Sequence, residues 1–159
     1  MTATRTLVRI YPSHCAGNRF SAAHESRIEG ELSVLSDQDV EHYLLILGNA
    51  ELRYSGNQYG TKQQNICNRN PIGLLKELHR CLRSLNPDIL HLHTLHAGLA
   101  GGIIARFLRK RPLIIYEIHG AVAFESALRH KSASKYVRFL LLYVLESLAI
   151  VLCDRLILV

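Results

Sequence analysis

The chain of 159 residues has no tryptophan, a single methionine and only four prolines, and no stretch of it is repetitive or of low complexity. The absence of repeats argues against a solenoid or array architecture. Its four cysteines, Cys15, Cys67, Cys81 and Cys153, form no CxxC pair, and no signal-peptide-like segment precedes them. We therefore expect no disulfide framework. The prediction is a cytoplasmic protein with reduced thiols, two of them buried.

The composition is that of an ordinary globular protein, with 48% hydrophobic and 20% charged residues. Nineteen Lys and Arg against thirteen Asp and Glu give a formal net charge of +6. This excess favours anionic partners: phosphorylated lipid acceptors, acidic membrane surfaces or nucleic acid. Nucleic acid is the weakest of the three, because the basic residues are not interleaved with aromatics and no nucleic-acid-binding signature is present. We predict no nucleic acid partner.

An apolar run from Phe139 to Val159 has the length of a membrane span. As a span, however, it would place Glu146 near the bilayer centre and carry Asp154 and Arg155 within it. Each such charge costs roughly 2.5 to 3.5 kcal/mol at the centre of a membrane helix. A buried helix followed by a strand explains the run better.

Basic residues precede this apolar run: Arg129, His130, Lys131, Lys135 and Arg138. A basic, amphipathic region of this kind is able to lie on an anionic membrane surface. The alternative is an ordinary solvated face, which the sequence favours slightly. Peripheral membrane contact therefore stays open beside it.

The clearest structural unit is a strand, a helix and a second strand between residues 87 and 120. The first strand, 88–93, follows Pro87, and the second, 113–118, is rich in β-branched and aromatic residues, as buried parallel strands are. Between them, residues 97–109 are apolar and glycine-bearing and end in basic residues, which predicts a crossover helix with a basic last turn. Each strand ends in a histidine.

The remaining elements complete an alternating order. We predict strands at 6–11 and 43–47, a helix at 21–35, and an irregular polar segment at 51–70 with a short strand near 65–67. A helix opens at Pro71. Its predicted buried face comprises Leu75, Leu78, Leu82 and Leu85. The predicted fold is therefore α/β: a single Rossmann-like, doubly wound parallel sheet with helices on both faces.

Three motifs in this order resemble a known family. They are PDILHLH at 87–93, YEIHG at 116–120, and a helix at 135–153 carrying Glu146 and followed by CDRLILV at 153–159. Together they resemble the N-terminal, acceptor-side domain of family 4 glycosyltransferases. The resemblance implies retaining enzymes of the GT-B type, built from two Rossmann-like domains, of which the second binds the nucleotide-sugar donor.

Under this resemblance residues 1–159 are one N-terminal domain, truncated at the end of its last strand, since a two-domain transferase needs roughly twice this length. The implied function is transfer of a sugar from a nucleotide-sugar to a glycan or lipid-linked acceptor, with little activity expected of the chain alone. Two alternatives stay open. One is a non-catalytic acceptor- or membrane-binding subunit completed by a donor-binding partner chain, and the other is an inactive gene fragment.

The resemblance also implies site residues. His119, beside Gly120 at the end of its strand, corresponds to the histidine that bonds the transferred sugar or the reaction centre. The loop after the first strand corresponds to a glycine-rich turn near the donor phosphates. It offers Gly17, Asn18 and Arg19, with one glycine where two are usual.

His91, His93 and His96 suggest zinc, but the sequence places no carboxylate or cysteine beside them. The favoured interpretation has His91 packed in the sheet and His93 or His96 lining the substrate cleft. We predict no metal and no cofactor other than the donor substrate. Glu117 and Glu125 copy a Glu-x7-Glu spacing of the family's second domain, and we interpret this spacing as coincidence.

Overall fold

The computed structural model describes residues 4–12, 22–35, 40–48, 60–67, 70–129 and 135–159. These residues contain one six-stranded, entirely parallel sheet with the strand order β3-β2-β1-β4-β5-β6. The strands are β1 (Arg5–Pro12), β2 (Val40–Leu47), β3 (Lys62–Ile66), β4 (Ile89–His93), β5 (Leu113–Ile118) and β6 (Arg155–Leu158). The predicted α/β, Rossmann-like fold is confirmed. The strand order reverses between β1 and β4, which is where open α/β sheets bind ligands, outside the carboxyl ends of the strands.

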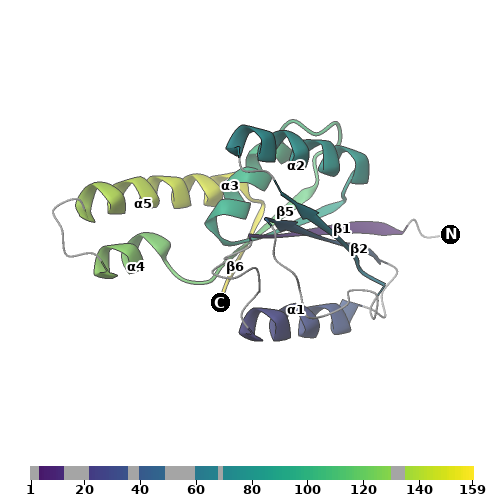
Figure 1. Ribbon diagram of the computed structural model, residues 1–159, viewed down its shortest axis with the longest axis horizontal. Coiled ribbons are helices and arrows are strands. Elements are labelled where there is room, and N and C mark those ends of the chain that lie inside the picture. Colours follow the sequence, from purple (N-terminus) through teal and green to yellow (C-terminus); the bar gives the residue numbers. More distant parts are fainter. Residues whose placement is uncertain (1–3, 13–21, 36–39, 49–59, 68–69, 130–134) are drawn as a thin grey trace.

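Helices cover both faces of this sheet (Figure 1). They are α1 (Ala22–Leu35), α2 (Pro71–Leu85), α3 (Thr94–Ala105), α4 (Val122–Arg129) and α5 (Lys135–Leu152). Helix α1 lies on one face, and α2 and α3 lie on the other, while α4 and α5 extend past the β6 side of the sheet (Figure 1). Helices on both faces are the arrangement that parallel strands require, because both sides of each strand are then buried.

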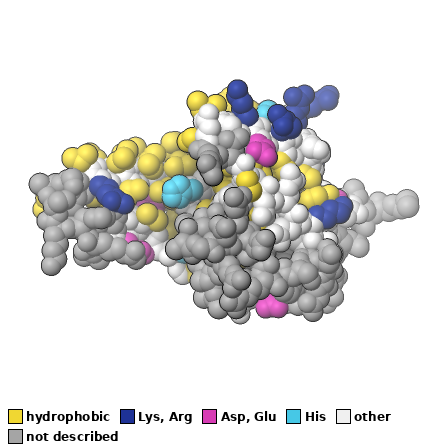
Figure 2. Space-filling model, in the orientation of Figure 1, with side chains coloured by type: hydrophobic (Ala, Val, Ile, Leu, Met, Phe, Trp, Pro, Cys, Tyr) yellow, Lys and Arg dark blue, Asp and Glu magenta, His cyan; other side chains and the backbone are white. Residues whose placement is uncertain are grey.

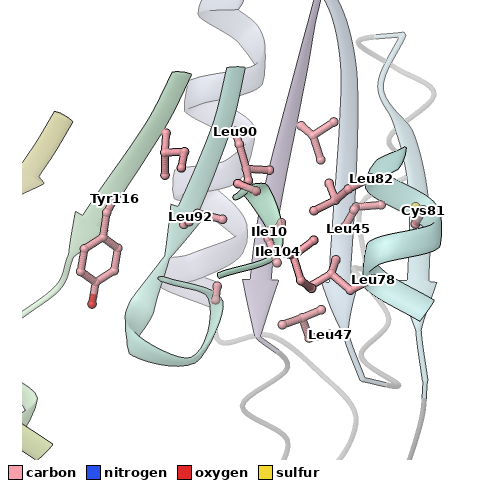
Figure 3. Packing of buried hydrophobic residues seen from close by; sticks show 14 of the residues in the cluster. Ile10, Leu45, Leu47, Leu78, Cys81, Leu82, Leu90, Leu92, Ile104 and Tyr116 are labelled. Carbon is pink, nitrogen blue, oxygen red and sulfur yellow. The ribbon is translucent and has the colours of Figure 1, made fainter. Parts of the chain in front are cut away.

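The two faces of the sheet differ in chemistry. On the face covered by α2 and α3 lie Val8, Ile10, Leu90, Leu92 and Tyr116, all nearly inaccessible to solvent (Figure 3). The residues that alternate with them point toward α1, and several are polar or charged. They are Arg9, Tyr11, His91, His93 and Glu117. Side chains of a strand alternate between faces, so one face holds the apolar core and the other holds a buried polar cluster.

Helix α3 packs close to the strands through its glycines. A methyl group at Gly98 would stand 2.7 Å from Cε2 of the Tyr116 ring, closer than carbon atoms approach each other. At Gly102 it would stand 3.0 Å from Cβ of Leu152 on α5. The glycines therefore serve close packing rather than chain flexibility: Gly98 lets α3 approach β5, and Gly102 lets it approach α5.

The helix predicted to open at Pro71 is confirmed. Asn70 caps it, because its side-chain oxygen accepts a hydrogen bond of 3.0 Å from the Ile72 N–H. Its predicted buried face is wrong at Leu75, which is exposed, whereas Leu74 is partly buried against the core. Both positions lie one turn before the buried Leu78, and the sheet covers only the Leu74 side.

The crossover helix was predicted at 97–109, but α3 begins at Thr94 and ends at Ala105. The chain turns directly from β4 into the helix. The basic residues expected in its last turn, beginning with Arg106, follow the helix instead, and its last turn contains no basic residue. The strand predicted at 113–118 is confirmed as β5. Helix α4, which follows it, was not predicted.

The C-terminal helix and strand are confirmed as α5 and β6, but the expectation that this helix is buried is wrong, because most of its apolar side chains are exposed. Within the described ranges, no helix combines the length and apolar composition needed to cross a membrane. Of the cysteines predicted to be free, Cys67, Cys81 and Cys153 carry free thiols, and Cys15 lies outside the described residues. Cys81 is buried, Cys153 only half-buried and Cys67 exposed, so the expectation of two buried thiols among the four cysteines stays a prediction.

Candidate functional site

A pocket of about 150 Å³ opens at the carboxyl ends of β4 and β5. The start of α3 forms one side of it, and the turn from β5 into α4 forms the other. Its lining comprises Thr94, Leu95, His96, Tyr116, Ile118, His119, Gly120, Val122 and Glu125. A second cavity of about 380 Å³, mostly apolar, lies beside it between α4, α5 and β6 and shares Gly120 with it. The pocket thus lies at the carboxyl edge of the sheet, where open α/β sheets bind ligands, beside the switch point between β1 and β4.

The structure brings some of the predicted site residues together here. His96, His119 and Gly120 line the pocket, and His96 is exposed on the first turn of α3. His93 does not line it. Its side chain is fully buried within the sheet, so the expectation that it faces the cleft is wrong for this residue. Gly17, Asn18 and Arg19 lie outside the described residues.

Gly120 has a backbone that only glycine adopts without strain. Its φ is +123°, and a methyl group at this position would collide with Oε1 of Glu125. The residue therefore lets the chain turn sharply between His119 and α4. This turn places backbone rather than a side chain at the junction of the two cavities.

On the other side of the pocket, the backbone of Thr94 is strained. Its φ is +72°, which is a true outlier for a β-branched residue. Its Oγ1 is buried and has no hydrogen-bond partner among the residues that the structure describes. Strained backbone and an unpaired buried hydroxyl cluster at functional sites, where the surrounding structure compensates for their cost.

Glu117 lies at the centre of the buried polar cluster, with 1% of its side chain exposed. Its Oε2 lies 3.0 Å from Nε2 of His91 and 3.3 Å from Nδ1 of His93. Its Oε1 lies 2.9 Å from Nε2 of His119 and forms an ion pair with the guanidinium of Arg27 on α1. Each carboxylate oxygen therefore lies close to two nitrogen atoms, although Oε1 has no partner in hydrogen-bond geometry within the part of the chain that the structure describes.

This environment keeps Glu117 ionised. Burial by itself would raise the pKa of its carboxyl group, but the His91 and His93 contacts lower it further, so that the pKa lies well below its ordinary value. The imidazole of His93, in contrast, is kept neutral by its surroundings. Burial lowers the pKa of that imidazole to about 3, although Glu117 raises it. The cluster thus contains an ionised carboxylate and a neutral buried imidazole.

A second ion pair extends the cluster toward β1. Arg9 Nη1 lies 2.9 Å from Oε2 of Glu31 on α1, and the Arg27 Nε donates to the other oxygen of the same carboxylate at 3.1 Å. The Tyr11 hydroxyl contacts Glu31 Oε2 at 3.5 Å. Burial, with Glu31 next in importance, raises the pKa of Tyr11 far above its ordinary value, so this hydroxyl is a neutral hydrogen-bond donor.

Two overlapping sets of side chains have ligand atoms within 4.8 Å of one another: Glu31, His91 and His93, and also His93, Glu117 and His119. The sequence places no carboxylate beside these histidines, but the fold does, because β5 supplies Glu117. Yet Arg27 and Arg9 already pair with the two carboxylates. A divalent cation would have to enter a charge-balanced cluster and displace a guanidinium. The donor set is thus better suited to ion pairs than to a metal.

Sequence reasoning missed most of this cluster. It considered Glu117 only for its spacing from Glu125, and it did not single out Arg9, Arg27 or Glu31. A usable signal was present in the alternation of β1, β4 and β5. In an otherwise apolar parallel strand, a charged residue two positions from a histidine points to a buried partner on the same face. The partners on α1, Arg27 and Glu31, are not marked by any such pattern in the sequence.

The parallel sheet, whose strand order reverses between β1 and β4, defines a Rossmann-type α/β domain with a pocket at the carboxyl ends of the next strands, β4 and β5. The family model of Glycosyltransferase Family 4 matches residues 35–159, and the chain belongs to this family. Comparison with curated proteins gave no match.

Proposed function

We propose that this domain forms the acceptor-side half of a retaining glycosyl-transfer site, which moves a sugar from a nucleotide-sugar to a glycan or lipid-linked hydroxyl. The observation that carries the proposal is the position of His119. It is half-exposed at the pocket, while its ring contacts the buried Glu117. Membership of the family supports the reaction class. The fold alone does not, since it hosts many chemistries.

In this proposal His119 bonds a hydroxyl of the transferred sugar, and His96 and the backbone of Gly120 line the remaining wall of the pocket. The first turn of α3 also faces the pocket, where its partial positive charge favours an anionic group. We also propose that Gly17, Asn18 and Arg19, which lie outside the described residues, bind the donor phosphates. Charge stabilisation comes from these groups and needs no metal or other cofactor.

A donor-binding domain completes the site, either further along a polypeptide or on a partner chain. The test is transfer of labelled sugar from UDP-glucose, UDP-N-acetylglucosamine and GDP-mannose to a lipid extract, by the 159-residue chain alone and with the candidate donor-binding domain from its own locus. We expect transfer only when both are present. Efficient transfer by the chain alone would contradict the division of the site between two domains.

A second candidate function is an acceptor- or membrane-binding subunit, and one observation favours it. The outer face of α5 is apolar along its whole length (Figure 2). Its exposed apolar residues are Tyr136, Val137, Leu140, Leu141, Tyr143, Val144, Leu148, Ile150 and Val151. Soluble proteins seldom expose a continuous apolar face of this extent without a binding function.

The charges of α5 suit an anionic bilayer. Its acidic residue, Glu146, is buried and accepts a hydrogen bond of 3.3 Å from the Val122 N–H, so it faces away from this surface. Arg138 is exposed near the start of the helix. Residues 130–134 of the predicted basic segment lie outside the described residues. In this candidate, α5 lies on the cytoplasmic surface of a membrane and brings the pocket to a lipid-linked acceptor.

A further inference from the structure

We propose that the apolar cavity between α4, α5 and β6 holds a hydrocarbon chain of the acceptor, so that the acceptor of this domain is an amphipathic lipid rather than a free sugar. The occupant is an acyl or isoprenoid chain, whose polar end enters the neighbouring pocket beside His119. That this chain belongs to an acceptor rests on the proposed function. The ability of the cavity to bind hydrocarbon does not, because it follows from the lining and the size of the cavity.

The walls of the cavity are largely hydrocarbon and come from four elements. The apolar lining comprises Ile118 of β5, Phe124 of α4, Tyr143 and Ile150 of α5, and Leu158 of β6 with the following Val159. Four of these side chains are more than half exposed: Phe124, Tyr143, Leu158 and Val159. Large apolar side chains gathered around a hollow that is open to water favour an apolar occupant, because that occupant removes them from water.

The aromatic part of this wall is held by ring contacts. The centroids of Phe124 and Phe139 lie 5.1 Å apart, with their planes at 78°, and those of Phe139 and Tyr143 lie 6.1 Å apart, with their planes at 20°. This row of rings joins α4 to α5. It fixes Phe124 and Tyr143, the two rings that line the cavity, relative to each other, so the wall is formed before a ligand binds.

One carboxylate in the lining sets the polarity of the occupant. Glu146 is buried, and its Oε1 accepts a hydrogen bond of 3.3 Å from the Val122 N–H, which ties the start of α4 to α5. A carboxylate in the wall repels a phosphate or a second carboxylate, whereas an uncharged chain passes it. An anionic group of the same ligand is better placed in the neighbouring pocket, at the first turn of α3. The occupant of the cavity is thus the uncharged end of the ligand.

The size of the cavity suits a chain of limited length. An engineered apolar cavity of about 150 Å³ holds a benzene molecule. By this proportion the cavity of about 380 Å³ has room for roughly ten to fifteen carbon atoms. It is concave and has the volume of a small-molecule site, whereas a stable protein partner covers about 800 Å² of a broader surface. A lipid chain therefore fits this cavity better than a protein does.

The position of the cavity connects the chain to the reacting group. Ile118 and Gly120 line both the cavity and the pocket beside His119. Because Gly120 has no side chain, one molecule is able to extend from the first space into the second. Its hydrocarbon chain then lies between α4 and α5 while its hydroxyl lies beside His119. A free sugar would leave the apolar cavity empty.

The direct test is a fluorescence titration of the 159-residue chain with N-phenyl-1-naphthylamine, an uncharged probe whose emission rises in apolar surroundings. We expect saturable binding, and displacement of the probe by decanol and by geraniol. Decanol represents an acyl chain and geraniol an isoprenoid, so the tighter of the two identifies the kind of chain. Glucose should displace nothing. Displacement by neither alcohol would overturn the proposal.

Two variants of α5 locate the binding. Ser147→Phe adds a ring inside the cavity, whereas the matched control Val144→Phe adds a ring to the outer face of the helix, because Ser147 lines the cavity and Val144 does not. The ring removes room for several carbon atoms, each worth about fourfold in affinity. We expect Ser147→Phe to weaken probe binding tenfold or more, on the order of such losses, and Val144→Phe to match wild type. Equal effects of both variants would place the probe on the outer face and overturn the proposal.

A second matched pair covers the case in which Ser147→Phe does not fold. Ile150 and Leu148 are 39% and 42% exposed on the same helix, and of these two only Ile150 lines the cavity. Ile150→Ser should weaken probe binding by about fivefold or more, whereas Leu148→Ser should leave it unchanged. The same loss in both variants, or in neither, would contradict binding in the cavity.

Transfer to the lipid extract gives a separate readout in the completed enzyme. Ser147→Phe should raise the KM for the lipid acceptor by about tenfold with kcat little changed, because the cavity binds the chain and not the reacting atoms. An unchanged KM would contradict the assignment of the chain to the acceptor. Absence of transfer in every form would instead count against the proposed function, and the probe titration would still decide whether the cavity binds hydrocarbon.

Discussion

Tyr11 and His93 lie face to face, with their ring centroids 3.7 Å apart and their planes 17° from parallel. One ring comes from β1 and the other from β4, the two strands between which the order of the sheet reverses. The stack closes the buried cluster on the β1 side. It also removes His93 from water, and this burial has a measurable consequence for the pH dependence of folding.

Stability should fall as the pH is lowered from 7 to 5. In the folded protein burial lowers the pKa of His93 to about 3, against 6.5 for an ordinary histidine. Between these values the unfolded chain binds a proton that the native protein does not, so stability rises with pH across this window. The loss expected from His93 between pH 7 and pH 5 is about 2 kcal/mol. Urea unfolding at several pH values measures it.

Glu117 adds to this loss only below about pH 4.5, where an ordinary carboxyl group begins to bind protons. Measurements between pH 7 and 5 therefore isolate the histidine contribution. Folded His93→Gln should lose less stability on acidification than wild type, whereas His96→Gln, at an exposed position, should follow wild type. Equal pH dependence in wild type and His93→Gln would show that His93 is not held neutral.

Gly98→Ala should destabilise the domain. The added methyl group would meet Cε2 of the Tyr116 ring at 2.7 Å, and that ring is buried in the apolar core. Overpacking of this kind typically costs about 1–3 kcal/mol, which exceeds the gain of roughly 1 kcal/mol from the helix propensity of alanine. Thermal or urea unfolding measures the difference.

The control is Gly30→Ala on α1, where a methyl group would meet nothing within 4 Å. It should stabilise the protein by roughly 0.5–1 kcal/mol, because only the backbone effect remains. If both variants shifted stability in the same direction, the close packing of α3 on β5 would not be the reason for the glycine.

The fold could be predicted because its signals are local. Apolar strands such as 113–118, the proline that opens α2 and the regular spacing of its leucines each report on a few neighbouring residues. The errors lie where tertiary contacts decide between local solutions. Leu74 and Leu75 are equally compatible with the spacing of the apolar face of α2. Only the packing of the helix on the core decides that Leu74 is the one partly buried.

The site could be predicted in position but not in composition. A histidine and a glycine at the end of a strand mark the carboxyl edge of the sheet, which the pattern of the strands already locates. The ion pairs of Glu117 join β5 to α1, across 90 positions from Arg27, and no spacing in the sequence reports such a contact. The φ of +72° at Thr94 could not be predicted either, because threonine rarely adopts a positive φ and does not mark such a position in a sequence.

The chain should bind vesicles containing anionic lipid if α5 lies on a membrane. Leu141 and Val144 are exposed on its apolar face, and replacing both with Asn should weaken binding on the order of tenfold or more. Arg138→Glu should weaken it at low salt and have little effect at 0.5 M salt, where charges are screened. Co-sedimentation with phosphatidylserine vesicles measures both.

Helix α2, which is not part of the proposed membrane surface, provides matched controls. Ile72 and Arg83 are exposed there, so Ile72→Asn and Arg83→Glu change the same properties at a distance from α5. Binding that is unaffected by the α5 variants and by salt, or equally weakened by the α2 variants, would count against this surface.

The central claim is that the pocket beside His119 holds the reacting sugar. The measurement that tests it most directly is the rate of transfer from the nucleotide-sugar by the completed enzyme carrying His119→Ala, compared with His79→Ala on α2. We expect His119→Ala to lose about 10²–10³ in rate with its unfolding transition nearly unchanged, and His79→Ala to match wild type. A His119→Ala enzyme that is folded and as active as wild type would contradict the account.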